Sequence, residues 1–118
     1  MAISGMYPQI AHGEALSIIY PAFTRFTFQH AVPQFAFVGR TFNPDLARVS
    51  DNKAAEASCE AIDRFIHSIG MRFTLKNFKM PEAEIPDLAR ASMVLPDYKG
   101  NPRVATAGEM RELIQQSY

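Results

Sequence analysis

The pattern of hydrophobic and polar positions is most regular between residues 51 and 69. Apolar residues recur there at steps of three and four, at Ala55, Cys59, Ile62, Ile66 and Ile69. Such steps place side chains on one face of a helix, and the opposite face carries charged residues. Ser50 or Asp51 suits the N-cap and Gly70 suits the stop. The pattern predicts a surface helix with one buried side.

The densest apolar run lies between residues 14 and 29 and is interrupted by Pro21. Its apolar side chains project on nearly every side of a helix, which is typical of a segment buried all round. We expect a central helix from about Glu14 to about Gln29, kinked at Pro21 because proline lacks the N–H that would bond to the carbonyl of Ser17. Two shorter helices, or a strand over residues 16–20, are the alternatives.

A second helix is expected to begin at Pro33, which suits the first helical position because its missing N–H is not needed there. Its apolar positions at helical spacing are Phe35, Val38 and Phe42. Phe35 and Phe37 also alternate as in a strand, and Gly39 disfavours a helix by about 1 kcal/mol relative to alanine. The strand therefore stays open as an alternative.

Prolines and caps organise the C-terminal part of the chain. Pro81 is expected to begin one helical turn that ends at Glu84, and Pro86 a helix that ends near Met93. Residues 95–103 contain two prolines and a glycine and are expected to form a loop. Thr106 and Glu109 match a capping box for a last helix, whose buried stripe is Met110, Leu113 and Ile114.

The remaining segments are expected to be irregular. Residues 71–79 form a connector that packs down as a short turn through its apolar side chains. Residues 1–11 contain Gly5 and Pro8, which break any regular pattern. Ile3, Met6, Tyr7 and Ile10 are nevertheless apolar enough to favour burial, so we expect that this segment is not a disordered tail and that further sequence belongs before it.

Together these elements predict an all-α fold of about five helices around the buried, proline-kinked helix, in one domain over residues 1–118. No glycine-rich loop follows a strand, because the six glycines are scattered along the chain. A dinucleotide site of the usual kind is therefore not expected within these residues.

Composition narrows the possible partners. Twelve basic residues balance twelve acidic ones, which gives no electrostatic reason to bind nucleic acid or an anionic membrane surface. No apolar run approaches the roughly 20 residues that span a bilayer, and no secretory signal precedes residue 8. The single cysteine, Cys59, cannot form an internal disulfide, which favours the cytoplasm.

His12 is the best candidate for chemistry. It stands with Gly13 and Glu14 at the head of the central helix, where an imidazole can be aimed into a cleft and can bind divalent iron or zinc. Gly13 allows a tight turn or a close approach by another group. By itself, a histidine at this place is more often a capping or core residue. Glu14 is two residues away and points elsewhere on a helix.

The other reactive side chains have simpler interpretations. His30 suits a helix end and His67 the exposed or boundary side of its helix. Cys59 lies on a buried stripe, and Ser17 lacks the glycines of a hydrolase nucleophile motif. Glu82, Glu84 and Asp87 suit the acidic first turns of two helices. We assign no catalytic and no cofactor-binding residue within the chain.

The stretch Ile10-Ala11-His12-Gly13-Glu14-Ala15-Leu16-Ser17-Ile18-Ile19-Tyr20-Pro21-Ala22 resembles the signature of the iron-containing alcohol dehydrogenase family. In that signature a His-Gly pair, a short apolar run and a proline occur in this order. Residues 3–7, 70–75, 81–89 and 101–106 resemble further pieces of the family in the same order. The resemblance covers essentially the whole chain and corresponds to the C-terminal part of the family's helical domain.

The resemblance implies an oxidoreductase that moves a hydride between NAD(P) and an alcohol or aldehyde, with iron or sometimes zinc polarising the substrate oxygen. The family binds its metal through one aspartate and three histidines, and His12 matches the last of these histidines. The other three ligands and the nucleotide-binding half would precede residue 1. A further family histidine near the substrate would fall at Met1 or Ala2, which are not histidines.

We therefore expect the chain to be a C-terminal portion of such an enzyme that binds no metal or nucleotide and has no activity by itself. The alternative is a noncatalytic helical module that self-associates as a homo-oligomer, or that complements another chain. The segment 3–10 and the aromatic residues between 23 and 42 would then supply the contact surface.

Overall fold

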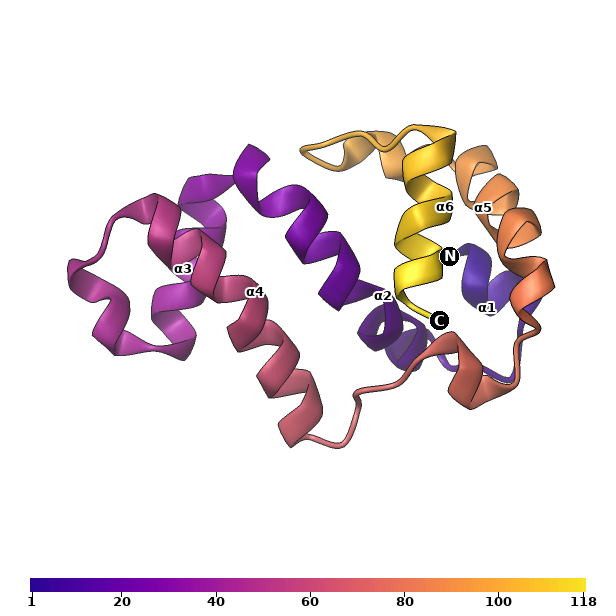
Figure 1. Ribbon diagram of the computed structural model, residues 1–118, viewed down its shortest axis with the longest axis horizontal. Helices are drawn as coiled ribbons and strands as arrows, with labels where there is room; N and C mark the ends of the chain where they lie inside the picture. Colours follow the sequence, from indigo (N-terminus) through magenta and orange to yellow (C-terminus); the bar gives the residue numbers. More distant parts are fainter.

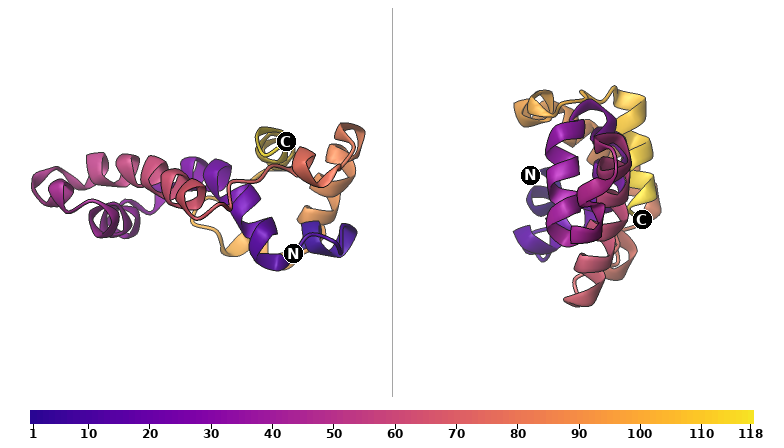
Figure 2. Two further views of the ribbon diagram at one scale, coloured as in Figure 1. Left: turned by 90° about the horizontal axis from the view of Figure 1, so that it is seen from below. Right: turned by 90° about the vertical axis from the view of Figure 1, so that its left-hand side faces the viewer.

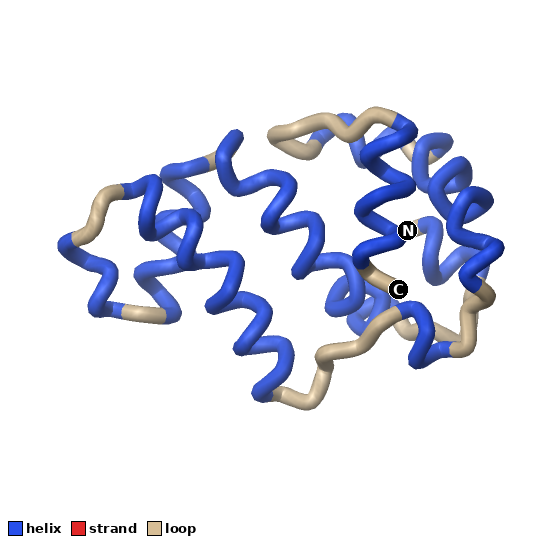
Figure 3. Tube along the Cα trace, viewed as in Figure 1, coloured by secondary structure: helices blue, strands red, loops and turns tan.

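The computed structural model describes residues 1–118 and contains only helices, turns and loops (Figure 3). The α-helices are α1 (Ala2–Met6), α2 (His12–Thr27), α3 (Val32–Phe42), α4 (Asp51–Ser68), α5 (Ile85–Val94) and α6 (Ala107–Gln116). Short 3-10 turns join them: η1 (Phe28–His30), η2 (Pro44–Arg48), η3 (Leu75–Phe78), η4 (Glu82–Glu84) and η5 (Pro96–Gly100). The expected all-α fold is confirmed. None of the helices combines the length and the apolar character needed to cross a bilayer.

The main core lies where α1, α2, α5 and α6 meet (Figure 1). It is one cluster of 16 buried residues, built mainly from branched and long aliphatic side chains. Its largest fully buried side chains are those of Ile10, Ile18, Leu75, Ile85 and Leu88. Both chain termini lie in this half of the molecule (Figures 1 and 2). The N-terminal side of α2 is therefore fixed to the best-packed part of the fold.

A hairpin of α3 and α4 extends from this core, so the molecule measures 45 × 30 × 18 Å (Figure 2). The radius of gyration is 14.8 Å, whereas about 13.5 Å is typical of a compact domain of this length. The hairpin has its own small cluster of Ala36, Ala54 and Ala55. A Cβ built on Gly39 would lie 2.4 Å from the carbonyl oxygen of Ala54, so the two helices touch here through backbone. Gly39 is needed for this contact.

Helix α2 continues without a break through Pro21, so the single helix is confirmed against two shorter helices or a strand. The Pro21 carbonyl accepts hydrogen bonds from the Arg25 guanidinium (2.8 Å) and the Thr24 hydroxyl (3.2 Å). Complete burial is not observed, because Tyr20 is 46% exposed while Ala15 and Ile18 on other faces are buried. The expectation of a helix buried all round is therefore wrong on the Tyr20 side.

The N-terminal segment is more regular than expected. Residues 2–6 form α1, in place of the predicted irregular stretch. Ala2 and Ile3 are buried against the main core, and a Cβ at Gly5 would meet no neighbouring atom. Burial of one apolar face thus outweighs the helix-breaking tendency of a single glycine. Tyr7 and Ile10 are buried as expected, whereas Met6 is 39% exposed.

The predicted ends of α4 are confirmed. The Ser50 hydroxyl accepts a hydrogen bond from the Lys53 N–H, and Gly70 has a φ of +72°, which glycine adopts more readily than residues with a side chain. The predicted apolar stripe is buried at Ala55, Cys59 and Ile66, but Ile69 is 55% exposed. The apolar stripe therefore continues to the C-terminal end of α4, where no other part of this chain covers it.

Helix α3 is confirmed against a strand, but its predicted apolar side is only partly covered. Phe42 is 44% exposed, and the buried residues are Ala36 and Gly39. The small residues of α3 face α4 because the two backbones approach each other closely, and this displaces the phenylalanines to the edges of the contact.

The C-terminal elements agree with the sequence. Helix α5 has proline at its first turn, and the loop after it contains the 3-10 turn η5. The capping box of α6 is present, since the Glu109 N–H donates to the Thr106 hydroxyl (3.2 Å) and the Thr106 N–H donates to the Glu109 carboxylate (2.9 Å). Met110, Leu113 and Ile114 are buried as predicted.

Candidate metal-ligand position

His12 is the first residue of α2 and its side chain is exposed. The Ala11 N–H donates to the Glu14 carboxylate at 2.9 Å, and the Ala15 N–H donates to the Ala11 carbonyl at 2.9 Å. Ile10 and Ala15, on either side of the turn, are 1% and 0% exposed. The imidazole is thus exposed on a backbone that is anchored on both sides.

A contact far along the sequence holds the segment before His12. The Tyr7 hydroxyl donates a hydrogen bond to the Glu84 carboxylate, across 77 positions of sequence. Burial, followed by the hydrogen bond to Glu84 and the negative charges of Glu84 and Asp87, raises the pKa of Tyr7 to about 12. The phenol therefore remains a donor at neutral pH. This contact fixes the turn before α2 against the start of α5.

The chain by itself does not provide a metal site around His12. Nowhere do three His, Cys, Asp or Glu side chains lie close enough together to bind one ion. Glu14 is the nearest carboxylate in sequence, and its oxygen already accepts from the Ala11 N–H. Because a catalytic metal in proteins typically has three or more protein ligands, one imidazole does not fit that role unaided.

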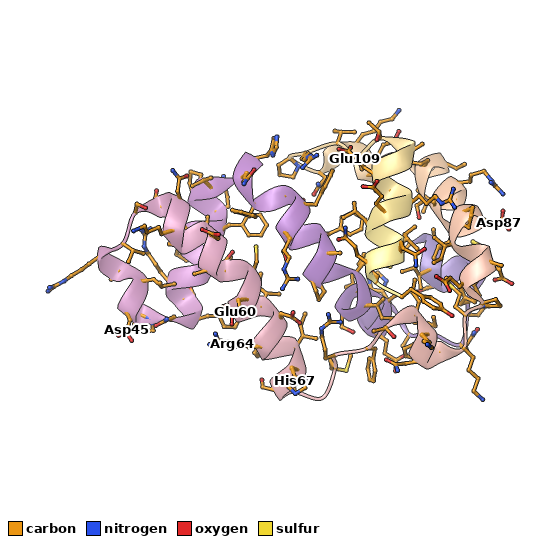
Figure 4. All side chains as sticks on the ribbon, viewed as in Figure 1. Asp45, Glu60, Arg64, His67, Asp87 and Glu109 are labelled. Atoms are coloured by element: carbon orange, nitrogen blue, oxygen red, sulfur yellow. The ribbon has the colours of Figure 1, made fainter.

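The other candidates do not join His12 in any group of three possible metal ligands. His30 ends η1, and His67 lies in the last turn of α4 (Figure 4). Both are exposed. Cys59 is 5% exposed. Burial raises the pKa of its thiol, although neighbours including Ser58 and Thr24 act to lower it. The prediction of a buried cysteine is confirmed, and the raised pKa makes it a poor nucleophile.

The acidic residues predicted for the first turns of two helices lie at helix starts as expected. Glu82 and Glu84 belong to η4, and Asp87 lies in the first turn of α5, on the outer edge of the molecule (Figure 4). The bond between Glu84 and Tyr7 was not predicted, because nothing in the local sequence pairs residues so far apart.

Two polar networks also escaped prediction. Asp63 on α4 accepts hydrogen bonds from Arg25 on α2 (3.2 Å) and from Arg72 (2.6 Å). Arg103 lies 3.9 Å from the centre of the Phe26 ring and binds Glu109 at 2.6 Å. No periodic signal marks such pairs, since each joins different elements. They fix α2 to its neighbours rather than building a reactive centre.

Comparison with known proteins supplies the context for His12. A sequence model described as the Fe-containing alcohol dehydrogenase family, C-terminal, matches residues 1–118. The chain is 25% identical over 116 residues to a 1,3-propanediol dehydrogenase of Citrobacter freundii, covering 98% of this chain and 30% of that protein. It is also 25% identical over 114 residues to a lactaldehyde reductase of Escherichia coli K12, covering 97% of this chain and 30% of the relative.

The fold has a counterpart among solved structures. The crystal structure of a 1,3-propanediol oxidoreductase superposes with a TM-score of 0.89 at 23% identity, over 99% of this chain and 30% of that one. The chain thus spans about 30% of the length of the relatives that it matches. Because the family match extends over all 118 residues, the chain belongs to the C-terminal part of the iron-containing alcohol dehydrogenase family.

Proposed function

We propose that this chain forms the C-terminal part of a metal-dependent, NAD(P)-linked alcohol dehydrogenase or aldehyde reductase, with His12 as one of its metal ligands. The observation that carries the proposal is the presentation of His12, whose exposed imidazole stands on a helix start that buried neighbours hold in place. The relatives named for propanediol and lactaldehyde support a small alcohol or aldehyde as the substrate class.

The chain contributes a ligand position and a scaffold, and the remaining ligands come from the part of the enzyme that corresponds to the other 70% or so of the relatives. Iron or zinc in such a site supplies Lewis-acid polarisation of the substrate oxygen. His12 holds one coordination position, and Tyr7 with Glu84 keeps the preceding turn in place. We further propose that the enzyme works in the cytoplasm and that the chain has no turnover by itself.

The test uses a chimera in which these 118 residues replace the matching region of the Citrobacter freundii enzyme. The chimera is purified as wild type and with His12→Ala, and its metal content is measured by mass spectrometry. We expect His12→Ala to lower bound metal at least tenfold. His30→Ala and His67→Ala, which remove the other exposed imidazoles, are the matched controls and are expected to leave the metal content unchanged.

Two outcomes contradict the proposal. One is metal binding by the His12→Ala chimera that equals that of wild type. The other is steady-state turnover of an alcohol or aldehyde by the isolated 118-residue chain with iron and NAD(P)H, because a single imidazole would then suffice.

A further inference from the structure

An apolar groove of about 500 Å³ runs between α2 and α4. Its walls include Leu16 and Tyr20 from α2 and Ile62, Phe65 and Ile69 from α4. Tyr20 and Ile69 were expected to be buried but are 46% and 55% exposed, and Phe65 beside them is 46% exposed. At Tyr20 and Ile69 the sequence pattern predicts a buried surface, and in the structure no other part of this chain covers that surface.

The groove exposes no polar atom to a ligand, although three of its lining residues, Ser17, Tyr20 and Thr24, carry hydroxyl groups. The Ser17 hydroxyl donates to the Glu14 carbonyl at 2.8 Å, and the Thr24 hydroxyl donates to the Pro21 carbonyl at 3.2 Å. The Ser17 and Thr24 hydroxyls are thus satisfied within α2. A charged or hydrogen-bonding ligand would lose its hydration here without compensation, so the occupant must be apolar on the side that enters.

The dimensions of the groove fit a helix. Along α2 the lining residues extend from Gly13 to Thr24, which at a rise of 1.5 Å per residue is about 17 Å, or three helical turns. Helices α2 and α4, which form the two walls, are antiparallel (Figure 1). Two neighbouring helices leave a furrow that accepts the side-chain ridge of a third helix.

One end of the groove lies at His12. Gly13 lines that end, and a Cβ added there would meet no atom of this chain. Its φ is not positive, so the backbone does not require glycine for a tight turn. The missing side chain keeps the mouth of the groove open beside the proposed ligand.

We infer that this groove binds the apolar face of a helix of about three turns from the part of the family fold that precedes the region shared with this chain. The inference rests on the proposed function, and its second support is that the relatives carry about 70% of their length outside the shared region. One end of the groove lies beside His12, so docking would place residues of that helix next to the imidazole.

Hydrogen exchange tests the inference on the isolated chain and on the chimera with the Citrobacter freundii enzyme. In the chimera, the amides of residues 16–20 and 62–69 are expected to exchange at least tenfold more slowly than in the isolated chain. Amides of α3 between residues 39 and 42, none of which lines the groove, are expected to exchange equally in both.

Charge substitutions sharpen the test. Tyr20→Asp and Ile69→Asp put a carboxylate into the groove at positions that are exposed in the isolated chain, so the unfolding midpoint of that chain should not change. In the chimera they should abolish the added protection. Val94→Asp is the matched control, because Val94 is 82% exposed and lies outside the groove; it should leave the protection intact.

Three results overturn the inference: groove amides equally exposed in both proteins, an insoluble wild-type chimera, or protection that survives Ile69→Asp. A fourth contradicting result would come from light scattering on the isolated chain. If the chain forms a dimer that Ile69→Asp dissociates, a second copy of the chain covers the groove. Groove protection without bound metal sustains the docking but rejects the proposed function. Metal bound through His12 without groove protection supports the proposed function but rejects the docking.

Discussion

The two halves of the molecule are stabilised in different ways. Around α1, α2, α5 and α6, 16 buried residues form a core in which large aliphatic side chains remove apolar area from water. In the α3–α4 hairpin the buried cluster contains only three alanines, and Gly39 lies against backbone. Both halves show helical periodicity in the sequence. The comparison teaches that periodicity identifies the buried face of a helix. It does not tell whether large side chains or a close approach of the two backbones stabilises the packing of that face.

Truncation of a large core side chain tests the first half and should have the largest effect. Leu88→Ala removes a residue that is 0% exposed, and we expect it to lower the free energy of unfolding by about 2–5 kcal/mol. In the hairpin, Phe37→Ala removes a larger side chain that is 72% exposed, with an expected loss of less than about 0.5 kcal/mol. Urea unfolding followed by circular dichroism measures both. Similar losses would show that the two halves do not differ in this way.

Enlargement by one methyl group tests the second half. Gly39→Ala places a Cβ 2.4 Å from the Ala54 oxygen, so the helices must separate, at an expected cost of about 1–3 kcal/mol. Gly5→Ala in α1 is the matched control, because its Cβ would meet nothing within 4 Å. There the better helix propensity of alanine should stabilise by up to about 1 kcal/mol. If Gly39→Ala also stabilises the chain, the backbone contact between α3 and α4 is not tight.

The difference between the halves also explains what could be predicted from the sequence. Periodicity, prolines and caps located α2 to α6 because these signals are local, as with Ser50 and Gly70 around α4. The openness of the Tyr20 side of α2 was missed because periodicity reports what a helix would bury, not whether a neighbour is there to cover it.

For the candidate site, too, local features could be predicted from the sequence and long-range contacts could not. His12 could be selected from its place at a helix head and from its family signature. The anchoring of its turn through Tyr7 and Glu84 could not be, because 77 positions separate them and only the fold brings them together. The same holds for Asp63, whose partners come from α2 and from the connector after α4.

Loss of the Tyr7 hydroxyl should have a smaller effect, confined to the first half. Tyr7→Phe keeps the buried ring and removes the bond to Glu84, with an expected loss of about 1 kcal/mol. Since the folded pKa of Tyr7 is raised to about 12 from 10.0, its contribution is present below pH 10 and disappears as the pH rises through 12. Urea midpoints at pH 8 and in alkaline buffer measure this. A variant with an unchanged midpoint at pH 8 would show that the bond does not stabilise the turn before His12.

The smallest expected effect concerns Asp63, which joins the two halves by binding Arg25 of α2 from α4. Partial burial acts to raise the pKa of Asp63, but hydrogen bonds from Arg25 and Arg72 outweigh it and hold the pKa below 3.8. The contribution to stability is therefore present above the unfolded pKa and is lost as the pH falls through the folded value. Because the Asp63 and Arg25 side chains are 26% and 51% exposed, water screens the pair, and Asp63→Asn should cost about 1 kcal/mol or less at pH 7.

Urea midpoints between pH 2 and pH 7 check this prediction, with Asp45→Asn as the control because Asp45 is exposed and forms no ion pair. Wild type and Asp45→Asn should lose stability in parallel as the pH falls, whereas Asp63→Asn should lose less and converge with them at the acid end. Parallel curves for all three proteins would show that Asp63 does not connect α4 to α2. The hairpin would then be held to the main core by apolar contacts alone. The hydrogen bond between Arg25 and Asp63 would not stabilise the packing of α2 against α4, the two helices that form the walls of the groove.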